Sequence, residues 1–267
     1  MAPPARTIIT FTTDFGLVDG WVAAMKGVVL SLAPDAQLVD VTHAVPPQDV
    51  RAGAFVLGTT WSAFPAGTIH VAVVDPGVGT GRRGLALEMQ GHRFVGPDNG
   101  LFTFPLRMAE AAGAPVRAVS LDRPEFHAAE VSATFHGRDV FAPVAGHLAA
   151  GRALGELGSA IDPRSLVRLG VQAAGARGEV LHVDRFGNLI TSLAPPRTPA
   201  RVRLPGAGPA AAALRLVRTF ADVPPGEAAA LVGSSGLVEI VVNQGHAAQR
   251  FAARRGDPVE LVPEAPA

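Results

Sequence analysis

The sequence predicts two domains: an α/β domain with a mainly parallel central sheet, followed by a smaller all-β, barrel-like domain. Strand and helix patterns alternate through about residue 110, which is typical of a parallel α/β layer. Residues 171–178 (VQAAGARG) are small and form the best candidate for a linker. Beyond them the pattern changes to short strands with turns and little helical periodicity. We therefore place the domains at residues 1–172 and 178–267.

The composition narrows the class of protein. With 267 residues, 48% of them hydrophobic, the chain is long enough for a sizeable core. Its formal net charge is zero, so we expect neither a nucleic-acid partner nor attraction to an anionic membrane. Cysteine is absent, which excludes disulfides, thiolate metal ligands and a cysteine nucleophile. No stretch reaches about 18 apolar residues and the first residues lack a signal-peptide pattern, so we expect a soluble cytoplasmic protein.

The α/β domain begins with alternating strands and helices. The predicted elements are a strand at 7–12, a helix at 21–32, a strand at 37–41, a helix at 50–64 and a strand at 68–74. A hairpin follows, with strands 85–89 and 93–95 around Gln90 and Gly91. A further helical run opens at residues 135–139 (FHGRD).

The stretch from Thr68 to Arg83 (TIHVAVVDPGVGTGRR) organises this domain. Its apolar first half suits a strand buried on both faces, and the strand stops at Asp75. The glycines at 77, 79 and 81 allow backbone angles that are closed to other residues, and Arg82 follows them. A carboxylate at the end of a buried strand, before a glycine loop, is the usual layout of a site in an open α/β sheet. The alternative is a plain turn in which Asp75 caps nearby N–H groups.

The second domain carries short strands separated by polar turns. We expect strands at 179–184, 189–192, 201–204, 214–219, 229–232, 237–242 and 258–262. The turns with the most polar side chains are DRFGN (184–188), GSSG (233–236) and NQGH (243–246). Each of these turns by itself is compatible with a plain hairpin or with part of a binding site.

Polar residues that could carry chemistry follow the strands of the first domain. Asp14, Asp75 and Asp98 each lie where a predicted strand meets a loop. Together with Arg82 and His136 they supply acid–base and charge-stabilising groups, but no obvious nucleophile.

Metal and phosphate sites are not favoured by the spacing of these residues. His43, His70 and His136 could join two of the aspartates, but no HxH, HxxE or DxD pattern is present, so we predict no metal. We expect His43 and His70 to be hydrogen-bonded structural residues. The glycine loop lacks the GxxxxGK[ST] pattern and no GxGxxG follows the first strand, which disfavours kinases, NTPases and Rossmann dehydrogenases.

Eight segments in order carry a family resemblance. They are TTDFG (12–16), DGWVAAMKG (19–27), DVTHAVPPQDV (40–50), FPAGTIHVAVVDPGVGTGRR (64–83), FVGPDNGL (94–101), TFHGRDVFAP (134–143), VDRFGNLITS (183–192) and GSSGLVEIVVNQG (233–245). The set resembles the S-adenosyl-L-methionine (SAM) hydroxide adenosyltransferases, a family that also contains fluorinating and chlorinating enzymes. The resemblance extends over both predicted domains.

The resemblance implies a reaction and a catalytic set. Water or hydroxide would attack C5′ of SAM, giving adenosine and L-methionine, with SAM as substrate and no cofactor. Asp75, Arg82 and His136 match the catalytic Asp-Arg-His set of the family. The halogenating relatives have tyrosine in place of Asp75 and tyrosine or a similar residue in place of His136, so the chain resembles the hydroxide-using branch.

The resemblance also implies binding residues and an assembly. These are Asp14 for the ribose hydroxyls, Asp19 and Asp184 near the methionine ammonium, Ser234 and Ser235 near its carboxylate, Asn188 at the adenine edge and Phe135 as an apolar wall beside C5′. A stacking tryptophan of the halogenases falls on Gln48. The family implies a homotrimer in which each pocket lies between the first domain of one subunit and the second domain of its neighbour.

Two other functions remain open from the residues. A halogenase forming 5′-halo-5′-deoxyadenosine would use the same fold. A non-catalytic SAM- or nucleoside-binding protein would keep Asp14 and Asn188 but would not need the Asp75, Arg82 and His136 set. A methyltransferase is disfavoured, because no glycine-rich SAM loop follows the first strand.

Overall fold

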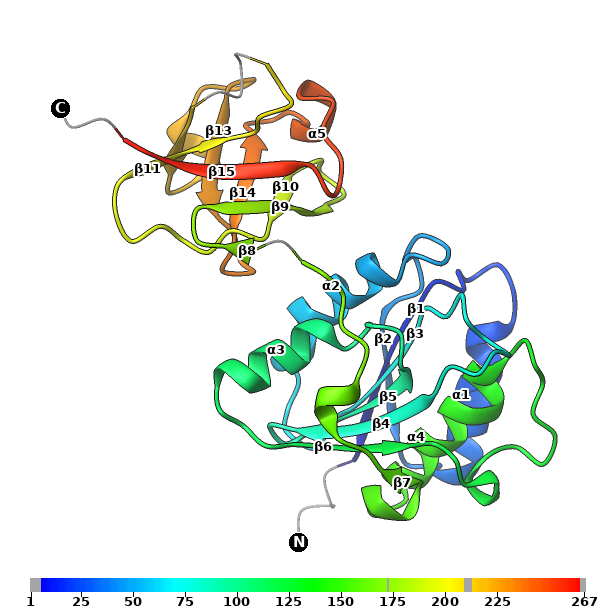
Figure 1. Cartoon of the computed structure of the whole chain (residues 1–267). Helices are drawn as coiled ribbons and strands as arrows, with labels where there is room; N and C mark the ends of the chain where they lie inside the picture. The colour runs from blue at the N-terminus through cyan, green and yellow to red at the C-terminus, as the bar shows by residue number, and fades with distance from the viewer. Residues whose placement is uncertain (1–5, 172, 209–212, 265–267) are drawn as a thin grey trace, which may run out of the picture. The chain divides into compact units, whose positions relative to one another are not determined.

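The computed structural model of the chain describes residues 6–171, 173–208 and 213–264 (Figure 1). Its residues pack into two compact units that divide between Leu169 and Gly170. The first unit is an α/β domain and the second an all-β barrel, which confirms the predicted fold class. Position 172, where the sequence analysis ended the first domain, lies outside the described residues. Within the described residues, no helix has the length and apolarity needed to cross a membrane.

The first unit is built on one mixed sheet. Its strands, in spatial order, are β2 (Gln37–Thr42), β1 (Ile8–Thr13), β3 (Ile69–Val73), β5 (His92–Pro97), β4 (Gly84–Met89), β6 (Val116–Ser120) and β7 (Ser159–Ala160). Pairing is parallel from β2 through β5 and antiparallel from β5 through β7. The hairpin of β4 and β5 turns at Gln90 (φ 49°) and Gly91 (φ 77°), as predicted, because both central residues of such a turn need positive φ.

Helices cover both faces of this sheet (Figure 1). The four helices are α1 (Trp21–Leu32), α2 (Val50–Thr60), α3 (Thr103–Ala111) and α4 (Ala142–Ala149). On one face α1 and α4 pack with Phe11 and Val71, and on the other α2 and α3 pack with Leu87 and Phe94. Every residue of β3 is buried because the strand has a helical layer on each side, which explains its continuous apolar sequence.

The strand order creates a switch point between β1 and β3. From β1 the chain passes through α1 to β2 at one edge, and from β3 it continues toward β4 and β5 on the other side. Loops that leave two neighbouring parallel strands in opposite directions open a crevice at the carboxyl ends of the strands. Asp14 follows β1 and Asp75 lies two residues beyond β3, so both lie at this crevice.

The strands of the second unit close into a barrel. They are β8 (Ala173–Ala174), β9 (Arg177–Val183), β10 (Leu189–Thr191), β11 (Ala200–Arg203), β12 (Leu214–Val217), β13 (Ala228–Val232), β14 (Val238–Val242) and β15 (Pro258–Pro263), with the short helix α5 (Ala247–Arg250). The order β10-β14-β13-β12-β11-β15-β9 is closed by pairing of β9 with β10, and β8 extends β9 on one side. Val180, Val202, Val238 and Ile240 contribute to the barrel core.

The segment predicted to be a linker is partly strand in the structure. Ala173 pairs with Gly178 and Ala174 with Arg177, across a turn that contains Gly175 at φ 59°. Small side chains gave this segment no apolar pattern, yet backbone hydrogen bonds alone suffice for a short hairpin. The prediction of a linker over the whole segment was therefore wrong.

Candidate active site

A cavity of about 390 Å³ lies at the carboxyl ends of β1 and β3. Its lining residues are Asp14, Phe15, Trp21, Pro47, Gln48, Val73, Asp75, Pro76, Val78, Thr134, Phe135, His136 and Gly137. The cavity therefore contains four of the predicted site residues, from three distant parts of the chain. Its volume falls within the range of about 300–1,000 Å³ that is usual for small-molecule sites.

Asp75, Arg82 and His136 form one connected group at this cavity. Arg82 Nε donates to Asp75 Oδ1 at 3.0 Å and to Oδ2 at 2.9 Å, and its Nη2 also bonds Oδ2. The same Nη2 lies 2.8 Å from His136 Nδ1. Asp75 and His136 line the cavity, whereas Arg82 lies behind them with its guanidinium over the Phe141 ring. The side chain of Arg82 is 11% exposed, so its charge acts through poorly hydrated surroundings.

The environment of His136 favours the neutral imidazole. Burial lowers the pKa of His136, and the adjacent Arg82 charge lowers it further, against opposing contributions from Asp75 and Asp139. Because a guanidinium is only a donor, Nδ1 of His136 must accept the bond from Arg82. The proton of the neutral ring is then on Nε2, which makes this nitrogen a donor.

The loop after β3 is held against a second loop by one glycine. Gly79 has φ 75°, and a Cβ on it would overlap the carbonyl oxygen of Ala133. Gly77 and Gly81 have no such conformation and no such backbone overlap. Of the three glycines that allow unusual backbone angles, only Gly79 combines positive φ with a close backbone approach.

The second loop carries Phe135 and His136 into a π-helical turn, Gly137–Phe141. Asp139 fixes this region: its carboxylate accepts from Ser132 N–H at 2.9 Å and from Arg138 Nε at 2.6 Å. Phe135 is buried and meets Trp21 edge-on, with ring centroids 5.2 Å apart. Single-turn π-helices are rare and are often found at functional sites. Trp21 was not predicted as a site residue, although it starts the first helix and lies in the resemblance segment at 19–27.

Asp14 is oriented by the backbone of Gln48. The Gln48 N–H donates to Asp14 Oδ2 at 2.7 Å, and Gln48 adopts φ 65°, a left-handed conformation that is uncommon for a residue with a side chain. This bond uses Oδ2 of the carboxylate and leaves Oδ1 available to a ligand. The exposed side chain of Gln48, on which a stacking tryptophan of the halogenases falls, lies at the cavity.

Two predicted aspartates of the first unit lie outside the cavity lining. Asp98 is buried, accepts from Arg83 Nε at 2.9 Å and from Val167 N–H at 2.9 Å, and so joins distant loops structurally. Asp19 is exposed in the loop before α1 and is not among the lining residues.

The predicted residues of the second unit lie on two turns of the barrel. Asp184 accepts from the N–H groups of Phe186 and Asn188 at 2.9 and 2.8 Å, and from Asn188 Nδ2 at 2.9 Å. Asp184 therefore organises its own turn and holds Asn188, which is buried. On the Gly233–Gly236 turn, Ser234 is exposed, while the Oγ of Ser235 is buried and has no hydrogen-bond partner among the described residues.

Sequence comparison gives the same division of the chain. Residues 9–158 match the SAM hydroxide adenosyltransferase N-terminal domain, and residues 178–260 match the SAM hydroxide adenosyltransferase C-terminal domain. The chain belongs to this family.

Individual relatives of this SAM hydroxide adenosyltransferase family member agree with the match. The "(R)-S-adenosyl-L-methionine hydrolase" of Salinispora arenicola is 48% identical, over 95% of this chain and 97% of that protein. The fluorinase of Nocardia brasiliensis is 28% identical, over 96% and 97% of the two chains. The crystal structure of an uncharacterized conserved protein from Thermotoga maritima superposes with TM-score 0.84 at 34% identity, covering 95% of this chain and all of that one.

Two histidines that the sequence analysis singled out, His43 and His70, have internal partners in this family member. His43 Nδ1 lies 2.8 Å from Thr13 Oγ1, and His70 Nδ1 lies 2.8 Å from Thr10 Oγ1. His70 Nε2 also lies 3.2 Å from His92 Nδ1. These contacts confirm the predicted hydrogen-bonded, structural role of His43 and His70. The part of the chain that the structure describes contains no cluster of three or more histidines and carboxylates suited to a metal ion.

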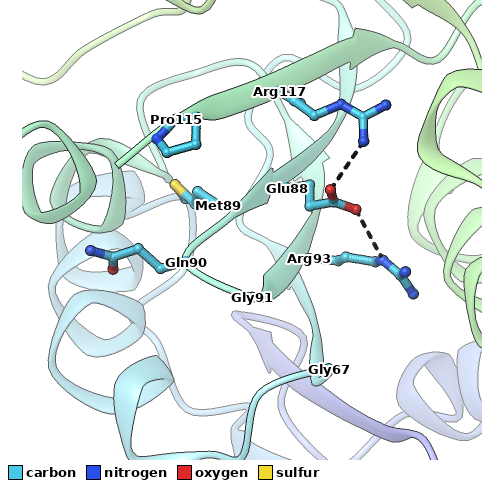
Figure 2. Close-up of a pocket in the computed structure, with 8 residues that line it drawn as sticks. All are labelled: Gly67, Glu88, Met89, Gln90, Gly91, Arg93, Pro115 and Arg117. Atoms are coloured by element: carbon cyan, nitrogen blue, oxygen red, sulfur yellow. Dashed lines mark hydrogen bonds and ion pairs between the residues drawn. The ribbon is translucent and has the colours of Figure 1, made fainter. Parts of the chain in front are cut away.

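A second cavity of about 370 Å³ lies at the turn between β4 and β5 (Figure 2). Figure 2 shows Arg93 and Arg117 directed at Glu88 from two strands, with N–O distances of 3.5 and 3.1 Å. Glu88 forms an ion pair with each of the two arginines, and Arg117 is exposed. This cavity lies beside Gly67, before β3, and thus at the opposite end of that strand from Asp75. It lacks a buried group of connected polar residues like Asp75, Arg82 and His136 at the first cavity.

Proposed function

We propose that this protein hydrolyses SAM to adenosine and L-methionine by attack of water at C5′. The observation that carries the proposal is the single guanidinium, Arg82, that contacts both Asp75 and His136 at the cavity wall. The hydrolase names of close relatives support the same activity.

The reaction needs an activated oxygen nucleophile rather than an acid for the leaving group. A bond forms between the water oxygen and C5′ while the C5′–S bond breaks and its electron pair stays on sulfur. Methionine then leaves as a neutral thioether, which needs no proton. Free water has a pKa of about 15.7 and is a weak nucleophile, so catalysis must act on the water.

The residues at the cavity suit that task. The Asp75 carboxylate retains lone pairs beyond those used by Arg82, so it is able to orient the water and accept its proton. Nε2–H of His136 is a donor for the oxygen as negative charge develops on it. The buried Arg82 charge stabilises that developing charge and fixes both partners. Asp14 would hold the ribose hydroxyls, and Phe135 would form the apolar wall beside C5′.

The names of the hydrolase relatives specify the R configuration at sulfur. We therefore propose that this chain also prefers the R sulfonium epimer of SAM. The two epimers differ in where the methyl and methionine groups point, so contacts to the methionine portion would distinguish them. Separated epimers, each incubated with the enzyme, should differ in kcat/KM, with faster release of adenosine from the R form.

Labelled water tests the reaction itself. In ¹⁸O-water the label should enter the 5′-hydroxyl of adenosine and not methionine. Unlabelled adenosine, or S-adenosylhomocysteine as the product, would exclude hydrolysis at C5′.

A halogenase is the alternative on the same fold. The Asp75 carboxylate facing the attack site would repel a fluoride or chloride ion at close range. Addition of either halide should therefore give no 5′-halo-5′-deoxyadenosine. Formation of such a nucleoside at a rate comparable with adenosine would assign the protein to the halogenating branch.

We further propose a homotrimer whose sites combine the first domain of one subunit with the second domain of its neighbour. Exposed apolar side chains support an interface near both sets of residues. Val18 is 99% exposed in the loop between the lining residues Phe15 and Trp21, and Phe186 is 74% exposed on the turn that carries Asn188.

Mixed trimers test the shared site. Asp75→Ala and Asn188→Ala subunits, each inactive alone, are dissociated together and allowed to reassemble. Each mixed trimer then contains one junction with both halves intact, so about a quarter of the wild-type sites should return. If subunits demonstrably exchange and no activity returns, the site is not shared between subunits.

A further inference from the structure

Four polar side chains of the first unit form a row that ends beside the cavity-lining turn after β1. Lys26 Nζ, on α1, donates to Asp40 Oδ2, on β2, at 2.6 Å. The other oxygen of Asp40 lies 3.0 Å from His43 Nε2, as a close polar contact rather than an aligned hydrogen bond. His43 Nδ1 lies 2.8 Å from Oγ1 of Thr13, the last residue of β1. We call these four residues the polar row.

The Thr13 hydroxyl connects His43 to the turn after β1. The Phe15 N–H donates to Thr13 Oγ1 at 3.2 Å, so the hydroxyl proton is free to bond His43 Nδ1. The proton of a neutral His43 ring is then on Nε2, beside the Asp40 carboxylate. Every group in the row therefore has a donor or acceptor role that is compatible with its neighbours.

Asp40 supplies a negative charge at the other end of the row. Burial opposes its ionisation, but the contacts with Lys26 and His43 lower the pKa of Asp40 below its ordinary value. Its carboxylate is therefore ionised at neutral pH. The side chain of His43 is only 2% exposed, so water screens its contacts poorly.

Backbone bonds join the same turn to the loop after β2. The Gly16 N–H donates to the His43 carbonyl at 2.8 Å, and the Gln48 N–H donates to Asp14 Oδ2 at 2.7 Å. The side chain of His43 adds a third connection between the two loops. Asp14 and Phe15 both line the cavity, so the directions of their side chains depend on this loop.

A second threonine–histidine pair on β1 provides a comparison. Thr10 Oγ1 lies 2.8 Å from His70 Nδ1, which is the same contact at the same distance. Thr10 and Thr13 are both fully buried. Thr10 lies within the strand and pairs with a residue of β3, whereas Thr13 ends the strand and accepts from the turn. Only the second pair is therefore connected to residues that line the cavity.

We propose that His43, acting through Thr13, is a positioning residue that fixes the turn carrying Asp14 and Phe15 at the cavity. This inference rests on the proposed binding of the substrate by Asp14 and adds a role for the loop after β2. His43 contributes to affinity by holding the turn, and it takes no part in the proton transfer at C5′.

The test compares Thr13→Val with Thr10→Val, which makes the same change in the other threonine–histidine pair of β1. Each substitution removes a hydroxyl and keeps a β-branched side chain in the strand. Thr13→Val should raise KM for SAM about 5- to 30-fold, the usual effect of losing one buried hydrogen bond. It should change kcat less than about threefold, because Asp75 and His136 are held by separate bonds to Arg82.

The matched variant separates positioning from a merely structural role. Thr10→Val should lower Tm, because it leaves a buried histidine nitrogen with one partner fewer, but its KM should stay within about twofold of the wild type. Equal KM values for the two variants would overturn the inference.

A double variant tests whether His43 acts through Thr13. His43→Leu removes the ring nitrogens and should raise KM by about as much as Thr13→Val. The combined variant should have no higher KM than the single ones, because both changes remove the same contact. Effects on KM that multiply would show that His43 does not act through Thr13 and would overturn the inference.

Amide hydrogen exchange separates this inference from the proposed reaction. Without ligand, Thr13→Val should speed exchange in the segment that contains Phe15 and Gly16 at least about fivefold, and Thr10→Val should not. Unchanged exchange in this segment, or faster exchange with no weaker binding of SAM, would overturn the inference.

Calorimetry with SAM covers the case in which the proposed reaction fails. If the wild type binds SAM but forms no adenosine, hydrolysis is refuted and the Kd for SAM replaces KM in the same comparison. Adenosine formation with unchanged KM in Thr13→Val would leave the reaction intact and remove only the role of His43. A wild type that does not bind SAM would overturn both proposals.

Discussion

The two regions that carry the candidate site differ in how far the chain satisfies its own polar groups. At the cavity of the α/β unit, Asp75, Arg82 and His136 bond one another, and Asp14 is held by a backbone N–H. On the barrel, the hydroxyl of Ser235 is buried without a hydrogen-bond partner among the described residues. The polar groups named in the first region therefore have hydrogen-bond partners without a ligand, whereas the Ser235 hydroxyl in the second region does not.

This difference has a physical reason. Groups that stabilise developing charge work best when they are fixed beforehand, because no reorganisation is then needed during the reaction. Groups that bind a charged part of the substrate have no partner until the substrate enters. Leaving them unpaired lowers the stability of the free protein. A substitution in the first region should therefore lower turnover, whereas one at Ser235 should weaken binding and spare stability.

The largest effect is expected at Arg82. Arg82→Ala removes the charge and releases both Asp75 and His136, so kcat should fall by on the order of 10²–10⁴. Adenosine release under saturating SAM measures it, with exposed Arg117→Ala as the matched control. Near-normal turnover of Arg82→Ala would show that the connected group is not required.

The contact between the two loops of the cavity gives the next largest effect. Gly79→Ala should destabilise the fold by about 1–3 kcal/mol, since Ala disfavours positive φ and its Cβ would overlap the Ala133 carbonyl. Gly81→Ala is the matched control, because nothing lies within 4 Å of its added Cβ. Urea unfolding of both variants measures the difference. Equal stabilities would mean that the close approach of the loops is not maintained in solution.

Acid should destabilise the α/β unit through His70. Burial and the adjacent His92 lower the pKa of His70 to about 3, so the folded protein stays neutral there while the unfolded chain gains a proton below about 6.5. The contribution to stability is complete above that pH and decreases toward pH 3. Between pH 6.5 and 5 the loss should be about 2 kcal/mol.

The histidine resonances in NMR spectra check this directly. The His70 ring should show no titration between pH 8 and 5, and urea unfolding should show stability falling over the range from 6.5 downward. A midpoint for His70 near 6.5 in the folded protein would contradict the assignment. The contrast with Ser235 is then clear, because His70 is buried with a partner and the Ser235 Oγ is buried without one among the described residues.

The smallest effect is expected at Gln48. Gln48→Gly retains the N–H that orients Asp14 and relieves a side chain from φ 65°, so stability should change by less than about 1 kcal/mol. KM for SAM should change little if only the backbone is needed. A large rise in KM would instead assign substrate contacts to the Gln48 side chain at the cavity.

Much of the fold was predictable because local patterns coincide with the tertiary structure. The strand at Ile69–Val73, the hairpin around Gln90 and Gly91, and the short barrel strands match the predicted segments closely. The helix α3 (Thr103–Ala111) and the strand β6 (Val116–Ser120) were not predicted. The helix is short and contains Pro105, and the strand has only five residues, so neither has a periodic pattern long enough to identify.

The candidate site was predictable in part. Asp14 and Asp75 could be located at strand ends, and the ordered motifs brought in Arg82 and His136. Trp21 and the backbone of Gln48 could not be found, because a lining position and a positive φ have no sequence signal here.

Sequence patterns were enough to identify the order of an α/β unit and a β unit, the aspartates at the carboxyl ends of strands, and the family. Which of these carboxylates share a cavity depends on the three-dimensional arrangement of the strands and loops. Asp75 meets His136 through Arg82, whereas Asp98, also at a strand end, is held by Arg83 and by Val167, which is 69 residues away. The physical reason is that the pleat and the long-range partners set the direction of each side chain, and both depend on strand order and packing rather than on local sequence.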